Sequence, residues 1–87
     1  MLEAKTNTIF DVLLYPNPTR GMAALQIRGD AKNITVAIAD MSGKTIWQSS
    51  YNNRTQINLP TEKLTAGVYL ITVKNNTESK IIKLVKE

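Results

Sequence analysis

Apolar residues alternate strictly with small or polar ones along Ile34-Thr35-Val36-Ala37-Ile38-Ala39. A period of two is typical of a β-strand with one buried face, here the face of Ile34, Val36 and Ile38. The stretch Met41-Ser42-Gly43-Lys44 follows, and its glycine can take the positive φ of a hairpin turn. A strand over residues 45–50 would return beside the first. The sequence therefore predicts antiparallel β-structure, built outward from this hairpin.

Further strands are predicted on both sides of the hairpin, each bounded by turn residues. Their ranges are 9–15, 22–28, 55–59, 68–74 and 79–85. Pro60 would end the strand before it, because proline has no N–H to donate to the hydrogen-bond ladder. One helical turn is expected over 61–65, with the side chain of Leu64 packed into the core. About seven short strands at this spacing predict an all-β, immunoglobulin-like antiparallel β-sandwich. The buried side chains are predicted to be Leu25, Ile27, Val36, Ile38, Ile57, Leu59, Leu70 and Ile82.

The length of 87 residues allows one domain. We expect residues 1–8 to be a linker or a cloning remnant and residues 9–87 to form the domain. No apolar run approaches the roughly 20 residues of a membrane helix. The polar, charged start does not have the pattern of a signal peptide. If the domain is exported, the export signal would lie in a parent protein or in this sequence itself.

The residues of common active sites are missing or scattered. There is no histidine and no cysteine, which removes the commonest general base and the thiolate metal ligands. The acids form no paired motif, and no serine has a strand–turn–helix context. We therefore predict no enzymatic activity, no metal and no cofactor. The net charge of +4 is spread along the chain, without the dense basic patch of a nucleic-acid reader.

Three segments form a known pattern, in this order along the chain. They are Leu14-Tyr15-Pro16-Asn17-Pro18-Thr19-Arg20-Gly21, Leu64-Thr65-Ala66-Gly67-Val68-Tyr69-Leu70-Ile71 and Lys80-Ile81-Ile82-Lys83-Leu84-Val85-Lys86. Together with the turn Asp40-Met41-Ser42-Gly43-Lys44, they resemble the type A C-terminal sorting domain of the type IX secretion system. The resemblance runs from about Phe10 to the end of the chain.

This resemblance implies a function. Such domains are carried at the C-terminus of enzymes and adhesins of Gram-negative bacteria, recognised in the periplasm and moved through the outer membrane by translocon components. The cargo then reaches the cell surface or is secreted. A sortase-like protease removes the domain and joins the cargo to an anionic lipopolysaccharide. Cleavage would fall at or before residues 1–8, and the domain is expected to be a monomer.

The resemblance also marks candidate sorting-motif residues. They are Pro16, Asn17, Pro18, Gly21, Gly43, Gly67, Tyr69, Lys80, Lys83 and Lys86. The two prolines fix φ and predict an extended entry into a rigid corner, with Gly21 allowing the turn into the next strand. Gly67 is expected at positive φ or at a close backbone approach.

The side chains of the last two segments suggest roles of their own. The hydroxyl of Tyr69 is expected to tie down a loop. The last strand has apolar residues on both faces and lysines at intervals. It fits an edge that a translocon reads by strand addition, with Lys83 and Lys86 exposed. The alternative is that its lysines only protect a sheet edge from aggregation.

Two other functions fit a domain of this kind. One is a structural or adhesive immunoglobulin-like module that spaces other domains. The other is a carbohydrate-binding module, which usually presents coplanar aromatic side chains on a flat face. The five aromatic residues are Phe10, Tyr15, Trp47, Tyr51 and Tyr69. Trp47 is interpreted as half-buried packing rather than as part of a sugar platform.

Overall fold

The computed structural model describes residues 10–87, so the predicted linker (1–8) and Ile9 lie outside the described residues. The strands are β1 (Asp11–Tyr15), β2 (Ala23–Arg28), β3 (Ile34–Asp40), β4 (Thr45–Tyr51), β5 (Gln56–Leu59), β6 (Gly67–Lys74) and β7 (Ser79–Lys86). One 3-10 turn among residues 10–87, η1 (Thr61–Lys63), precedes β6. Within residues 10–87, no helix is long and apolar enough to cross a membrane.

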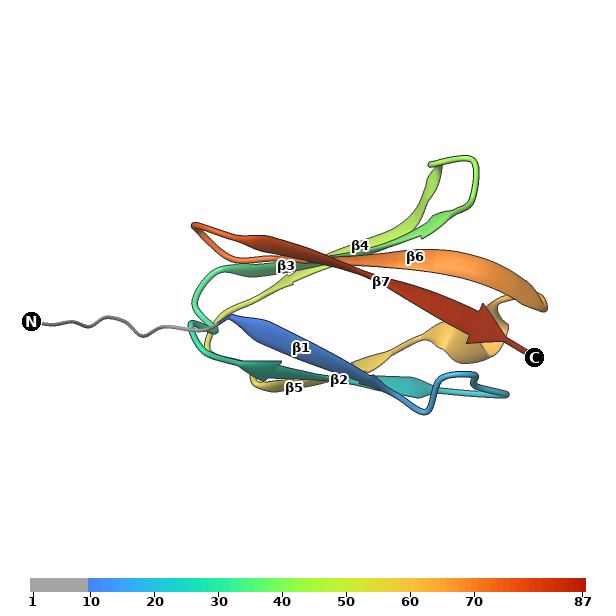
Figure 1. Ribbon diagram of the computed structural model, residues 1–87, viewed down its shortest axis with the longest axis horizontal. Helices are drawn as coiled ribbons and strands as arrows, with labels where there is room; N and C mark the ends of the chain where they lie inside the picture. The colour runs from blue at the N-terminus through green and yellow to red at the C-terminus, as the bar shows by residue number, and fades with distance from the viewer. Residues whose placement is uncertain (1–9) are drawn as a thin grey trace, which may run out of the picture.

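The strands form two antiparallel sheets that pack face to face (Figure 1). One sheet has the order β1-β2-β5 and the other has the order β4-β3-β6-β7. The chain passes between the sheets after β2, after β4 and after β5, as in immunoglobulin-like domains. The predicted fold is confirmed.

The core lies between the two sheets and follows the alternation of the strands. Its buried apolar side chains are Phe10, Leu14, Ala23, Leu25, Ile27, Ile34, Val36, Ile38, Ile57, Leu59, Tyr69, Ile71, Val73 and Leu84. The prediction is confirmed for Leu25, Ile27, Val36, Ile38, Ile57 and Leu59. Leu64 packs against this core as expected, and Trp47 is half-buried against it.

Two core predictions need correction. Leu70 is only half-buried, because Tyr69, Ile71 and Val73 are the inward-facing residues of β6. The strand is apolar on both faces, so its composition alone does not show which face is inside. Ile82 does pack against the core, but it is only half-buried because β7 is an edge strand.

The edge strands β1 and β7 lie side by side on one flank of the sandwich (Figure 1). The loop between β1 and β2 reaches the end of β7 on the same flank, whereas the tip of the β3–β4 hairpin stands away from the body of the domain. This arrangement separates Gly43, at that tip, from the other motif segments.

Candidate functional site

The proline-containing loop, residues 16–21, is held against the edge of β7. The side-chain amide of Asn17 donates from Nδ2 to the carbonyl of Lys83 (2.7 Å) and accepts at Oδ1 from the amide of Val85 (3.0 Å). It thus makes the pair of bonds that a residue of a neighbouring strand would make. The peptide bonds before Pro16 and Pro18 are both cis. The predicted extended entry is wrong, because the chain bends at residues 16–18 to bring this loop against β7.

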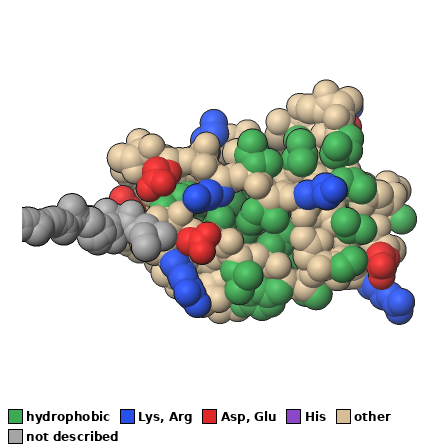
Figure 2. Space-filling view, viewed as in Figure 1, with side chains coloured by type: hydrophobic (Ala, Val, Ile, Leu, Met, Phe, Trp, Pro, Cys, Tyr) green, Lys and Arg blue, Asp and Glu red, His purple; other side chains and the backbone are tan. Residues whose placement is uncertain are grey.

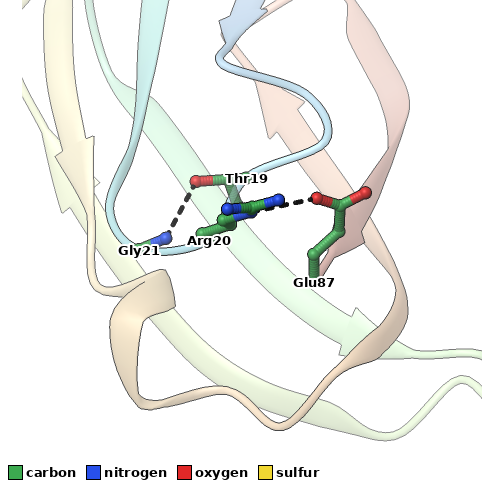
Figure 3. A network of polar contacts seen from close by, with 4 residues as sticks. All are labelled: Thr19, Arg20, Gly21 and Glu87. Atoms are coloured by element: carbon green, nitrogen blue, oxygen red, sulfur yellow. Dashed lines mark hydrogen bonds and ion pairs between the residues drawn. The ribbon is translucent and has the colours of Figure 1, made fainter.

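Thr19 continues the pairing that Asn17 begins. Its amide donates to the carbonyl of Val85 (2.9 Å), and its carbonyl accepts from the amide of Glu87 (2.8 Å). The Thr19 hydroxyl is buried and accepts from the amide of Gly21 at 3.3 Å (Figure 3). The loop therefore acts as a short additional strand over the last residues of β7.

An ion pair lies outside this hydrogen-bonded contact. Arg20 Nε stands 3.5 Å from Glu87 Oε1, and both side chains are largely exposed (Figure 3). Exposed pairs of this kind typically contribute about 0–1 kcal/mol. The backbone and Asn17 contacts, not this pair, hold the loop in place.

Lys86 is buried, which corrects the prediction that it is exposed. Only 6% of its surface is accessible. Its Nζ donates to the carbonyls of Leu64 (2.7 Å) and Glu62 (3.3 Å) at the end of η1. The inward position on β7 places the aliphatic stem beside the core, and the ammonium group finds its partners in main-chain oxygens. Lys86 therefore joins β7 to the segment before β6.

Thr61 is a buried connector that the sequence reading missed. Its hydroxyl donates to the carbonyl of Gly21 (2.6 Å) and accepts from the amide of Ala23 (2.8 Å). It thus joins η1 to the start of β2. Threonine after proline carries no local signal for this role, because both partners lie about 40 residues earlier in the chain.

Gly67 and Tyr69 support the entry into β6. Gly67 has a φ of +156° and lies opposite Lys86 in the β6–β7 ladder, so its predicted positive φ is confirmed. The Tyr69 hydroxyl donates to the carbonyl of Thr65 (2.7 Å), which confirms that it ties down the loop. A tyrosine that bonds back to the preceding corner in this way is a recurrent feature of immunoglobulin-like sandwiches.

The role predicted for Gly21 needs correction. The positive-φ glycines of residues 10–87 are Gly29, Gly43 and Gly67, and a Cβ placed on Gly21 would meet nothing within 4 Å. The turn at Gly21 therefore requires no special conformation. It contributes through its backbone amide and carbonyl, which bond to Thr19 and Thr61.

The β3–β4 turn forms as predicted, but it lies apart from the other motifs. Gly43 has a φ of +92°. The Asp40 carboxylate accepts from the Ser42 hydroxyl (2.6 Å) and from the amides of Ser42 and Lys44. The Ser42 hydroxyl, followed by the Lys44 amide, holds the pKa of Asp40 below its ordinary value. This turn stabilises a hairpin and brings no side chain to β7.

Lys80 and Lys83 are exposed, unlike Lys86. Lys80 lies near the start of β7 on the inward face and Lys83 on the outward face. The structure therefore divides the three motif lysines of β7 into one structural residue and two residues available to a partner. Pro16, Asn17 and Pro18 are exposed too, and Asn17 is bonded to the carbonyl of Lys83.

The arrangement is suited to recognition by another macromolecule. Within residues 10–87 no three acidic side chains gather where they could hold a metal ion. Trp47 and Tyr51 pack against the edge of the core, while Tyr69 is buried, so these aromatic rings do not form a flat exposed platform. The exposed part of the site consists of a loop, a sheet edge and two lysines.

These features define an immunoglobulin-like sandwich whose edge strand is partly covered by a proline-containing loop of the same chain. The family model of the secretion system C-terminal sorting domain matches residues 13–87, and the chain belongs to this family. No curated protein matches the chain. The domain is therefore a C-terminal sorting signal of the type IX secretion system, which implies contact with that machinery and a cargo that is secreted or displayed at the cell surface. The family is not an enzyme family.

Proposed function

We propose that the type IX machinery reads this domain as a folded unit, along β7 and the 16–21 loop packed against it. One observation carries the proposal: two of the family's motif segments meet in one hydrogen-bonded surface, through Asn17 and Thr19. The third segment supports that surface from inside, because the main chain at Leu64 binds Lys86.

The remaining steps of the proposal follow the transport of the cargo. The precursor passes through the periplasm, where the folded domain delivers it to the translocon. At the surface, a sortase-like protease cuts at or before residues 1–8 and joins the cargo to an anionic lipopolysaccharide. The domain acts as a monomer and catalyses none of these steps itself.

Lys83 gives a direct test of the surface that is read. A reporter is fused to residues 1–87 and expressed in a bacterium with a type IX system, with Lys83→Gln or Lys32→Gln in the domain. Both lysines are exposed, but Lys32 lies in the β2–β3 turn rather than on β7. Exposed substitutions of this kind usually change the free energy of unfolding by less than about 0.5 kcal/mol.

We expect Lys83→Gln to leave more reporter in the periplasm, with Lys32→Gln behaving as the wild type and both domains melting normally. Equal export of the two variants would remove Lys83 from the recognised surface. Removal of the domain is tested separately, by mass spectrometry of the reporter recovered from the cell surface. Deleting the sortase-like protease should leave the domain attached. If the domain is absent from the reporter in that strain as well, the proposed processing step is wrong.

A further inference from the structure

The backbone of β7 presents alternate residues to the open side of its sheet. The carbonyl of Lys83, both backbone groups of Val85 and the amide of Glu87 bond to the 16–21 loop, not to β6. In an antiparallel ladder, successive residues point their N–H and C=O groups to opposite sides. The backbone N–H and C=O groups of the odd-numbered residues of β7 therefore point to the open side of the sheet, and those of the even-numbered residues bond to β6.

The loop covers only the second half of this edge. The backbone N–H and C=O groups of Ser79 and Ile81, and the backbone amide of Lys83, have no hydrogen-bond partner among residues 10–87. This open stretch, Ser79–Lys83, is about 17 Å long at the usual rise of a strand. Unpaired N–H and C=O groups in such a row form a template for another strand.

The side chains of the open stretch favour one kind of strand. Ile81 is 65% exposed on the outward face. Figure 2 shows further hydrophobic side chains on this flank, between β7 and β1, with basic side chains among them. Lys80 and Lys83 are exposed on opposite faces of β7, so an incoming strand would meet a positive charge on each of its own faces.

We propose that Ser79–Lys83 accepts a β-strand from a protein of the secretion machinery. The incoming segment is extended, with an apolar side chain beside Ile81 and carboxylates beside Lys80 and Lys83. This inference rests on the proposed function and specifies how the site is read. A second copy of the domain fits less well, because two such edges would bring the lysines of both chains onto one ribbon, where like charges repel.

The test uses a substitution that blocks pairing without touching the fold. Ile81→Pro removes the outward amide and adds a ring on the open side, while the bonds from β7 to β6 come from the even-numbered residues. Proline is tolerated on an edge strand where its N faces solvent. The matched control is Gln48→Pro on β4, the opposite edge of the same sheet. Asp40, an even residue of β3, bonds to Lys44 across the β3–β4 turn, so the amide of Gln48, which pairs with Ala37, faces away from β3.

Both variants are compared in the reporter fusion with residues 1–87. We expect melting temperatures within about 4 °C of each other, wild-type export for Gln48→Pro, and export for Ile81→Pro reduced to the level of a strain without the translocon. Full export of folded Ile81→Pro would overturn strand addition and leave the sorting function intact. Failure of the wild-type fusion to leave the periplasm would instead contradict the proposed function, and this inference with it.

A second measurement does not depend on how the proline variants fold. Benzoylphenylalanine, a photo-crosslinker, replaces Ile81 in one fusion and Met41, at the exposed β3–β4 turn, in another. We expect crosslinks from position 81, and not from position 41, to an acidic segment of an outer-membrane component of the secretion system. Crosslinks between two copies of the domain, or equal yields at the two positions, would overturn the proposal.

Discussion

Replacing Lys86 by methionine tests whether this lysine stabilises the fold, in contrast to Lys83, which we propose is recognised by the secretion machinery. Methionine keeps an unbranched apolar side chain in the buried position, but it removes the ammonium group that donates to the carbonyls of Leu64 and Glu62. Both carbonyls would then lose a charged donor at the point where β7 meets the segment before β6. We expect Lys86→Met to lower the free energy of unfolding.

The size of the loss follows from two opposing effects. A hydrogen bond from a charged group contributes about 1.5–3 kcal/mol, and the bond to Leu64, at 2.7 Å, is the stronger of the two. Removing a buried charge recovers part of its desolvation cost. The net loss should be about 1–2 kcal/mol, which lowers the melting temperature of a domain of this size by roughly 5–15 °C.

The assay is thermal and urea unfolding of the purified domain, followed by circular dichroism, with Lys83→Met as the matched control. Lys83 is exposed, so its replacement should change the free energy of unfolding by less than about 0.5 kcal/mol. If Lys86→Met is as stable as Lys83→Met, the contact with η1 does not stabilise the fold and the structural role given to Lys86 is wrong.

Four further substitutions test other parts of the scaffold. Gly67→Val should cost about 1–3 kcal/mol because its φ of +156° disfavours a branched side chain, whereas Gly21→Ala should be neutral in the same urea titration; equal losses would refute this distinction. Tyr69→Phe leaves the Thr65 carbonyl without its donor and should cost about 1–2 kcal/mol, and an unchanged urea midpoint would argue against the corner contact. Asp40→Asn should destabilise the domain at neutral pH. Because the folded-state pKa of Asp40 lies below its ordinary value of 3.8, the carboxylate's contribution is fully present above that value and is lost as the pH falls through the folded-state pKa. The stability difference between the wild type and Asp40→Asn should therefore shrink in acid, and a constant difference would contradict this.

The sequence predicted the strands well because alternation is a local property. Ile34, Val36 and Ile38 show their buried face without any knowledge of the partner strands, and Gly43 marks its own turn. Leu70 could not be placed in this way, because β6 is apolar on both faces and only its pairing with β3 and β7 decides which face is inside.

The sequence indicates which segments form the site but not the contacts between them. The motif residues Asn17 and Lys83 were identified, yet their hydrogen bond spans 66 positions of the chain. Lys86 was assigned to the surface, because a lysine near the end of a strand usually lies there and its main-chain partners are distant in sequence. Thr19 and Thr61 carry no local pattern at all, since a threonine hydroxyl can bond to almost any nearby backbone group.

The most direct measurement of the sorting function is the location of a reporter fused to residues 1–87. The fusion, given its own signal peptide, is expressed in a bacterium with a type IX system and in the same strain lacking the translocon, and the reporter is quantified in the periplasm, at the cell surface and in the medium. The sorting function predicts surface or medium location in the first strain and accumulation in the periplasm in the second. The same distribution in both strains would contradict it.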